Sequence, residues 1–229
     1  MAYIFDGISL QNKRDTNMDS IMLAQRRIDG LNLYLGAVCD GVGSLEDGGF
    51  AASEAVRYLK CWFDTLPDAR RMGIRLLEAV GEADRTISEE AKQMRMKTAT
   101  TLSALLLEVD GMESNRFYIV HAGDSRIYSY RDGVVSQLTV DQSSNGKLTS
   151  YIGRYGRTKL FYEEHEPNGE LFLLCSDGLY KRMDIKVMAE ELSKVRGKGL
   201  QKTMKRLAQY VIDRGERDNI SIALLMEEE

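Results

Sequence analysis

Histidine, proline and cysteine are all scarce in this sequence of 229 residues. Two histidines, His121 and His165, supply too little imidazole for a multi-histidine metal centre or for catalysis that relies on histidine. Three cysteines without paired spacing indicate neither a disulfide framework nor a cysteine-rich zinc site. Any acid–base or metal chemistry in this chain must therefore rely on carboxylates.

Long apolar runs and basic stripes are also missing. No run of 18 or more apolar residues occurs, and the first letters, MAYIFDGISLQNKRD, lack the order of a signal peptide. The sequence therefore predicts a soluble, cytoplasmic protein without a membrane partner. The formal net charge is −4 and the basic residues are scattered, which argues against nucleic acid as a partner.

The chain contains enough apolar material for one sizeable core. Hydrophobic residues make up 43% of the sequence. We find no repeat of 20 to 50 residues, no low-complexity stretch and no linker-like tract. We therefore expect a single domain over residues 1–229.

Hydrophobic periodicity predicts a mixed fold. Short apolar runs rich in β-branched and aromatic residues predict strands at 20–28, 33–39, 101–108, 116–121, 125–130, 134–139, 171–176 and 219–226. A helical period predicts helices at 49–65, 70–95, 184–195 and 200–213. The pair Asp132-Gly133 marks a hairpin turn. Because strands and helices come in runs rather than in strict alternation, the pattern favours an α+β layered fold with mostly antiparallel sheet.

Three aspartates lie at the ends of strongly apolar runs. Asp40 follows LYLGAVC, Asp177 follows LFLLCS, and Asp218 precedes NISIALL. A carboxylate at a strand end lies beside the core yet reaches a cleft, where oxygen ligands commonly hold hard divalent cations. Asp-Gly is also an ordinary turn pair, so Asp40 and Asp177 each have a purely structural alternative when taken alone. Together the three predict a candidate cation site.

Six segments between residues 13 and 225 form an ordered series, and three of them carry these aspartates. They are KRDTNMDS (13–20), GAVCDGVGS (36–44), TATTLSALLLE (98–108), the Gly-Asp-Ser-Arg hairpin with its trailing Leu-Thr-x-Asp (118–143), LFLLCSDGLY (171–180) and RDNISIALL (217–225). In this order they resemble the blocks of the metal-dependent serine/threonine protein phosphatases of type 2C. The resemblance covers essentially the whole chain.

That resemblance implies a four-layer α-β-β-α sandwich, in which helix pairs flank a mostly antiparallel central β-sandwich with a metal cleft at one end. It implies two bound cations, Mn²⁺ or Mg²⁺. Asp40 would bridge them, and the backbone carbonyl of Gly41 would bind one of them. Asp177 and Asp218 would hold the other, and Asp19 would contact the centre through metal-bound water.

The implied activity is hydrolysis of phosphoserine and phosphothreonine in proteins by a water or hydroxide that bridges the two cations. Arg14 occupies the phosphate-binding position, where a guanidinium suits a phosphate dianion. The implied partners are phosphoprotein substrates and a cognate serine/threonine kinase in signalling, and the chain is expected to act as a monomer.

Asp124 matches a position that holds a further, weaker metal in the resembled family. Its companion acid would lie four residues after Asp177, where this chain has Lys181. A positive side chain there should repel a third cation, so a third metal site is doubtful on electrostatic grounds. The alternative is a structural role for Asp124.

Three further departures concern activity. Met18 stands where many members have a glutamate, and Val42 stands where some have a histidine that protonates the leaving oxygen. The connection SSNGKLTSYI (143–152) is shorter than the usual flap, which predicts an open cleft and broad selectivity. The alternative function is a pseudophosphatase that binds metal and phosphoproteins without efficient turnover.

Overall fold

The computed structural model describes residues 2–45, 47–110, 115–154, 156 and 158–228. Its strands are β1 (Tyr3–Leu10), β2 (Asp19–Ile28), β3 (Leu31–Asp40), β4 (Leu102–Val109), β5 (Arg116–Ala122), β6 (Arg126–Arg131), β7 (Val134–Gln137), β8 (Ser143–Ser144), β9 (Lys147–Leu148), β10 (Phe161–His165), β11 (Leu171–Cys175) and β12 (Ile220–Glu227). Its helices are α1 (Gly48–Asp64), α2 (Met72–Met94), α3 (Asp177–Tyr180), α4 (Ile185–Ser193), α5 (Val195–Lys198) and α6 (Leu200–Asp213).

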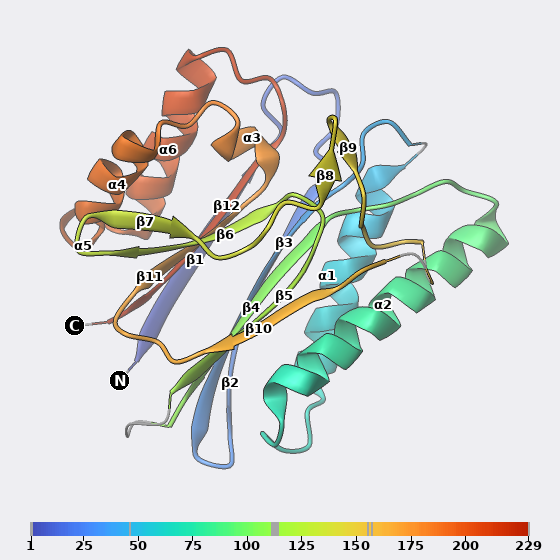
Figure 1. The fold of residues 1–229 in the computed structure, drawn as a ribbon, viewed down its shortest axis with the longest axis horizontal. Helices are drawn as coiled ribbons and strands as arrows, with labels where there is room; N and C mark the ends of the chain where they lie inside the picture. Colours follow the sequence, from blue (N-terminus) through green and yellow to red (C-terminus); the bar gives the residue numbers. More distant parts are fainter. Residues whose placement is uncertain (1, 46, 111–114, 155, 157, 229) are drawn as a thin grey trace.

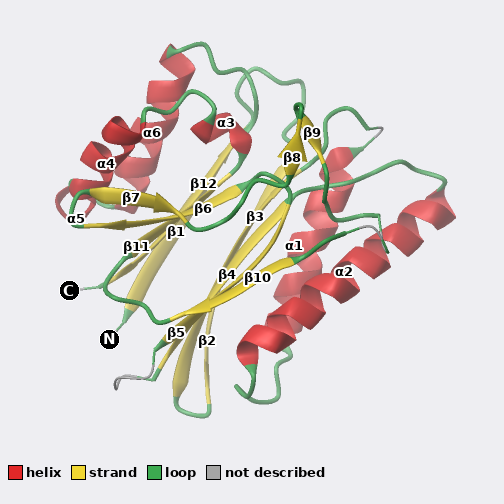
Figure 2. Cartoon of the chain, viewed as in Figure 1, coloured by secondary structure: helices red, strands yellow, loops and turns green. Residues whose placement is uncertain are grey.

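Ten of these strands form two five-stranded sheets that pack face to face (Figure 1). One sheet has the order β1-β12-β11-β6-β7, and the other has the order β10-β5-β4-β3-β2. Every pairing within them is antiparallel. Figure 2 shows α1 and α2 on the outer side of one sheet and α4 to α6 on the outer side of the other. The predicted α+β sandwich of four layers is confirmed.

Strand β3 shows why the fold has this layering. Leu33 and Leu35 belong to the core between their sheet and the helices α1 and α2. Tyr34 and Val38 alternate with them and belong to the core between the two sheets. Because successive side chains of a strand point to opposite faces, an apolar run without polar interruption is buried on both sides. A third cluster lies between the sheet β1-β12-β11-β6-β7 and the helices α4 to α6.

All eight predicted strands and all four predicted helices are present, with small shifts at their ends. The elements that the sequence analysis did not predict are β1, β8, β9, β10, α3 and α5. Strand β10 lies at a sheet edge and carries Glu163 and Glu164, so its composition resembles a loop. Within the described residues, no helix has both the length and the apolar character needed to cross a membrane.

Candidate metal centre

The predicted site residues meet at one end of the β-sandwich. Asp19 begins β2 and pairs directly with Asp40, the last residue of β3. Strand β11 ends at Cys175, so that Asp177 opens α3, and Asp218 lies two residues before β12 begins. Antiparallel pairing places the end of one strand beside the start of its neighbour. Because the two sheets also pack face to face, carboxylates from both sheets meet at this end of the sandwich.

A cleft of about 610 Å³ lies at this end of the molecule. The predicted residues that line it are Arg14, Met18, Asp40, Gly41, Val42, Asp124, Asp177, Lys181 and Asp218. Asp19 lies just behind this lining, and only 8% of its surface is exposed. The structure therefore gathers every candidate residue of the sequence analysis at one place.

The carboxyl group of Asp40 is costly to ionise in the cleft. Burial raises its pKa well above the usual range, and the charges of Asp19, Asp177 and the other carboxylates raise it further. Its backbone N–H donates to Thr101 Oγ1 at 2.9 Å, which fixes the strand end. A carboxylate that is costly to ionise without a counter-ion is suited to a bound cation.

Asp19 is held by contacts that join the two sheets. Ser176 donates its hydroxyl proton to Asp19 Oδ2 at 2.7 Å, and the same hydroxyl accepts the N–H of Ser221 at 3.0 Å. Burial still raises the pKa of Asp19 to about 6, with smaller contributions from neighbouring carboxylates. Asp19 is thus fixed in place behind the cleft, as expected for a group that acts through an intervening water.

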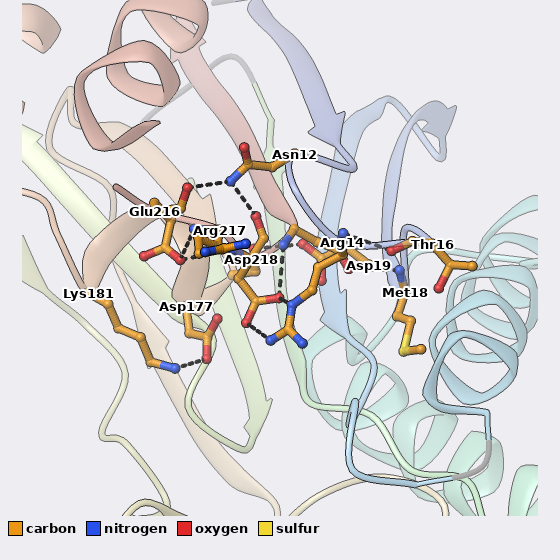
Figure 3. Close-up of polar contacts among 12 residues, drawn as sticks. Asn12, Arg14, Thr16, Met18, Asp19, Asp177, Lys181, Glu216, Arg217 and Asp218 are labelled. Atoms are coloured by element: carbon orange, nitrogen blue, oxygen red, sulfur yellow. Dashed lines mark hydrogen bonds and ion pairs between the residues drawn. The ribbon is translucent and has the colours of Figure 1, made fainter. Parts of the chain in front are cut away.

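Asp177 and Asp218 each face a basic side chain (Figure 3). Arg14 donates from Nε and Nη2 to both carboxylate oxygens of Asp218, at 2.8 and 2.7 Å. Lys181 is ion-paired with Asp177 one helical turn away. Among the described residues, five acidic side chains line the cleft, those of Asp15, Asp40, Asp124, Asp177 and Asp218, together with the basic side chains of Arg14 and Lys181.

The donor set fits a hard divalent cation, although its side chains do not converge on a single point. Among the described residues, no three acidic, histidine or cysteine side chains already form a closed set of ligands. The ion pairs explain this, because Asp177 and Asp218 are turned toward Lys181 and Arg14. Rotation of these two side chains would present carboxylate oxygens to the cleft, and oxygen ligands suit Mg²⁺ and Mn²⁺.

The backbone of Gly41 is closely packed at the edge of the cleft. A Cβ added to Gly41 would lie 2.5 Å from the carbonyl carbon of Gly48 and 2.7 Å from the carbonyl oxygen of Met18. Its N–H donates to that same oxygen at 3.2 Å. Only glycine allows the backbone to lie this close to its neighbours at the edge of the cleft.

Sequence reasoning did not identify the residue that holds the loop of Arg14 in place. Asn219 accepts the N–H of Met18 at 3.0 Å and donates to the carbonyls of Gln11 and Thr16, at 2.8 and 3.0 Å. It connects the start of β12 to a loop some 200 positions earlier. The available signal was an amide side chain directly after a candidate ligand, Asp218.

The buried carboxyl groups give the cleft a distinctive pH dependence. With a chelator present, the unfolding temperature is expected to fall as the pH rises from 5 to 7. Burial raises the pKa of Asp19 and of Asp124 to about 6, whereas an unfolded aspartate titrates near ~3.9. Between these values the folded chain binds more protons than the unfolded chain, so stability is lost as pH increases.

Thermal unfolding at several pH values, with chelator and with saturating Mn²⁺, would measure this effect. Saturating Mn²⁺ should reverse the slope, because cations bind only the ionised carboxylates. An Asp19→Asn variant should show a shallower slope with chelator. The same slope in this variant and the parent chain would contradict the assignment to Asp19.

Comparison with known proteins finds protein phosphatases that are similar to this chain in sequence. The chain is 26% identical over 236 residues to the serine/threonine protein phosphatase PstP of Mycobacterium tuberculosis, an alignment that covers 92% of this chain and 42% of PstP. It therefore spans less than half the length of that relative. It is 24% identical to a putative protein phosphatase of Mycoplasma pneumoniae, with 93% of this chain and 91% of that protein covered.

Among solved structures, the catalytic domain of PstP in complex with two manganese ions superposes with a TM-score of 0.79. Its sequence is 24% identical, and the match covers 98% of this chain and 97% of that one. This chain therefore shares its fold with that phosphatase domain. The family model for protein phosphatase 2C matches residues 9–220, so this chain belongs to the protein phosphatase 2C family.

Proposed function

We propose that this chain hydrolyses phosphoserine and phosphothreonine in proteins with the help of two divalent cations, Mn²⁺ or Mg²⁺. The observation that carries this proposal is that Asp40, Asp177 and Asp218, from two sheets, line one cleft together with Arg14. Family membership and the two manganese ions of the PstP structure support it.

Two bound cations would supply a water of lowered pKa as nucleophile and would stabilise negative charge on the phosphate. Asp40 lies close enough to the other carboxylates for their charges to act on it, and it would contact both ions, with the carbonyl of Gly41 as a further oxygen ligand. Asp177 and Asp218 would hold the second ion. Asp19, behind the lining, would orient water by a hydrogen bond.

Arg14 is proposed to bind the substrate phosphate. Its bidentate contact with Asp218 shows that the guanidinium can present two parallel N–H groups into the cleft. Slightly more than half of the Arg14 side chain is exposed, so its ion pair contributes little to stability and can exchange partners. A phosphate dianion offers the same pair of oxygens as the carboxylate.

Val42 lines the cleft but cannot protonate a leaving oxygen. For an aryl phosphate, which has a good leaving group, this matters little. For phosphoserine, a missing general acid costs roughly 10²–10⁴-fold in rate. Asp19, with its raised pKa, or a water in the cleft is proposed to take this role.

The experiment that tests the function is hydrolysis of p-nitrophenyl phosphate and of a phosphothreonine peptide, with Mn²⁺ and with chelator. Activity on both substrates is expected to require Mn²⁺. It should fall by more than about 100-fold in an Asp177→Asn variant, because loss of a ligand should exceed the loss of a group that merely orients one. Activity on the aryl ester alone would indicate that no general acid replaces the histidine.

No activity on either substrate, despite measured Mn²⁺ binding, would contradict the proposal. That outcome would favour the pseudophosphatase, a protein that binds phosphoproteins without turnover. An equal rate in the Asp177→Asn preparation would instead indicate a contaminating phosphatase.

A third cation beside Asp124 is proposed not to bind. Burial and the charge of Asp177 raise the pKa of Asp124 to about 6, whereas the ammonium group of Lys181 lowers it. That ammonium group therefore lies close enough to Asp124 to act on it, and it would repel a divalent ion at the same place.

Titration with Mn²⁺ is expected to saturate at two ions per chain in the parent protein and at three in a Lys181→Asp variant. Electron paramagnetic resonance of free Mn²⁺ would count them without reference to activity. Lys186→Asp, at an exposed position of α4, is a matched control that should still bind two. Three ions in the parent chain, or two in the Lys181→Asp variant, would refute the role of Lys181.

The signalling role and the opposing serine/threonine kinase belong to this proposal. The monomeric state, the cytoplasmic location and the single domain over 1–229 stay predictions of the sequence.

A further inference from the structure

A short hairpin forms one rim of the cleft. Strands β8 and β9 pair Ser143 with Leu148 and Ser144 with Lys147. Asn145 and Gly146 between them have φ values of 51° and 71°, the left-handed pair of a type I′ turn. Gly146 and Leu148 line the cleft beside the carboxylates. Figure 1 shows this hairpin standing at the same end of the sandwich as α3.

Gln142, the residue before this hairpin, uses all of its polar groups to bind three other segments. Its N–H donates to the carbonyl of Gly123 at 2.7 Å, and its Oε1 accepts the N–H of Gly123 at 3.0 Å. Its Nε2 donates to the carbonyl of Lys159 at 2.9 Å, and its own carbonyl accepts the N–H of Thr149 at 2.8 Å. The hairpin is therefore closed at its base and fixed to two neighbouring segments by one side chain.

Asp141, the residue before Gln142, is also anchored. The Nε and Nη2 of Arg126 donate to both carboxylate oxygens of Asp141, at 2.9 and 2.6 Å. The guanidinium of Arg126 lies 3.6 Å from the ring centroid of Tyr180 in α3. The contacts at Gln142 thus add to a base that already has a fixed position against the sheet.

Gly123 connects this base to the acidic end of the cleft. It immediately precedes Asp124 and has a φ of 114°, and a Cβ there would lie 2.7 Å from Cβ of Thr101. Thr101 in turn accepts the backbone N–H of Asp40 at 2.9 Å. The pair of hydrogen bonds between Gln142 and Gly123 therefore fixes the position of the hairpin relative to Asp124 and Asp40.

We propose that Gln142 is a positioning residue that fixes the β8–β9 hairpin as a rigid rim for the residues flanking a phosphorylated side chain. The inference rests on the proposed phosphatase function and assigns substrate positioning to a residue outside the carboxylate cluster. Because β8 and β9 have only two residues each, the hairpin can make few contacts with a bound peptide. The strength of each contact therefore depends on the hairpin being held in one position.

The first test is hydrogen exchange on a Gln142→Met variant, which keeps the length of the side chain and removes its two side-chain hydrogen bonds. Amides of residues 143–149 are expected to exchange about tenfold faster than in the parent chain, because two hydrogen bonds at the base are lost. Gln209→Met is the matched control, since Gln209 lies on α6 and its side chain donates to Asp213 of the same helix. It should leave exchange at 143–149 unchanged.

The second test compares substrates. In the Gln142→Met variant, KM for a phosphothreonine peptide is expected to rise about three- to tenfold. The kcat/KM for p-nitrophenyl phosphate, which has no flanking residues, should stay within about twofold of the parent value. If Gln142 had a merely structural role, kcat/KM would fall for both substrates together. That result would overturn the inference.

Unchanged exchange at 143–149 would also overturn it, whatever the kinetics. If the parent chain hydrolyses neither substrate, the proposed function fails, while the exchange experiment still decides whether Gln142 fixes the hairpin. The two failures are therefore distinguishable.

Discussion

Replacement of Asp40 by asparagine is expected to abolish cation binding and hydrolysis while making the chelated protein more stable. The loss of activity follows from the position of Asp40 among the other carboxylates, where it is proposed to contact both cations. Its removal should cost more than the roughly 10–100-fold that is typical of groups that only orient a ligand.

The gain in stability has a separate cause. Burial and the charges of Asp19 and Asp177 make ionised Asp40 unfavourable in the folded chain. A neutral amide of the same shape removes this repulsion, so the unfolding temperature with chelator at pH 7 should rise, by about 2–4 °C for each kcal/mol of repulsion removed. Such an exchange of stability for function is common at active sites.

Calorimetry with chelator and titration with Mn²⁺ would measure both effects on the same preparation. Asp132→Asn is a suitable control, because Asp132 is exposed in the β6–β7 turn with a φ of 50°, which asparagine also adopts. Its stability and Mn²⁺ binding should match those of the parent. An Asp40→Asn variant that is less stable than the parent would contradict the electrostatic account.

The kcat/KM of an Arg14→Ala variant is expected to fall about 10²–10³-fold, mainly because the variant lacks the guanidinium that contacts the phosphate. Inorganic phosphate should inhibit the variant far less than the parent chain. Arg14→Lys should recover only part of the activity, because an ammonium group cannot make the bidentate contact that Arg14 makes with Asp218.

Steady-state kinetics and inhibition by phosphate would test this expectation. Arg57→Ala is the matched control, since Arg57 lies on the exposed face of α1 in an ion pair with Glu54. Equal inhibition by phosphate in the Arg14→Ala variant and the parent would show that Arg14 does not bind the phosphate. Unchanged Mn²⁺ affinity would confirm that the metal ligands are intact.

The central strands were predictable because burial on both faces leaves an apolar run that no other element explains, as in residues 33–39 of β3. Strand β1 was not predicted, since most of its residues are only half buried and its sequence contains Asp6 and Gly7. The β8–β9 hairpin has a local signal, Asn145-Gly146, but its strands of two residues each are too short to show a periodic pattern.

The candidate site was predictable where chemistry lies in single residues next to apolar strands, as for Asp40 and Asp177. Residues that act through contacts between distant segments left no such pattern. Asn219 binds a loop 200 positions earlier, and Gln142 joins three segments through its side chain and backbone. Only the folded chain brings these partners together.

The cleft lies on the seam between the two halves of the sandwich. Asp19 and Asp40 belong to one sheet, whereas Asp177 and Asp218 border the other. Ions held by both pairs would cross-link the two sheets reversibly, so part of the free energy of ion binding would stabilise the folded chain. The lifetime of the folded protein, and hence its abundance, would then follow the supply of manganese or magnesium.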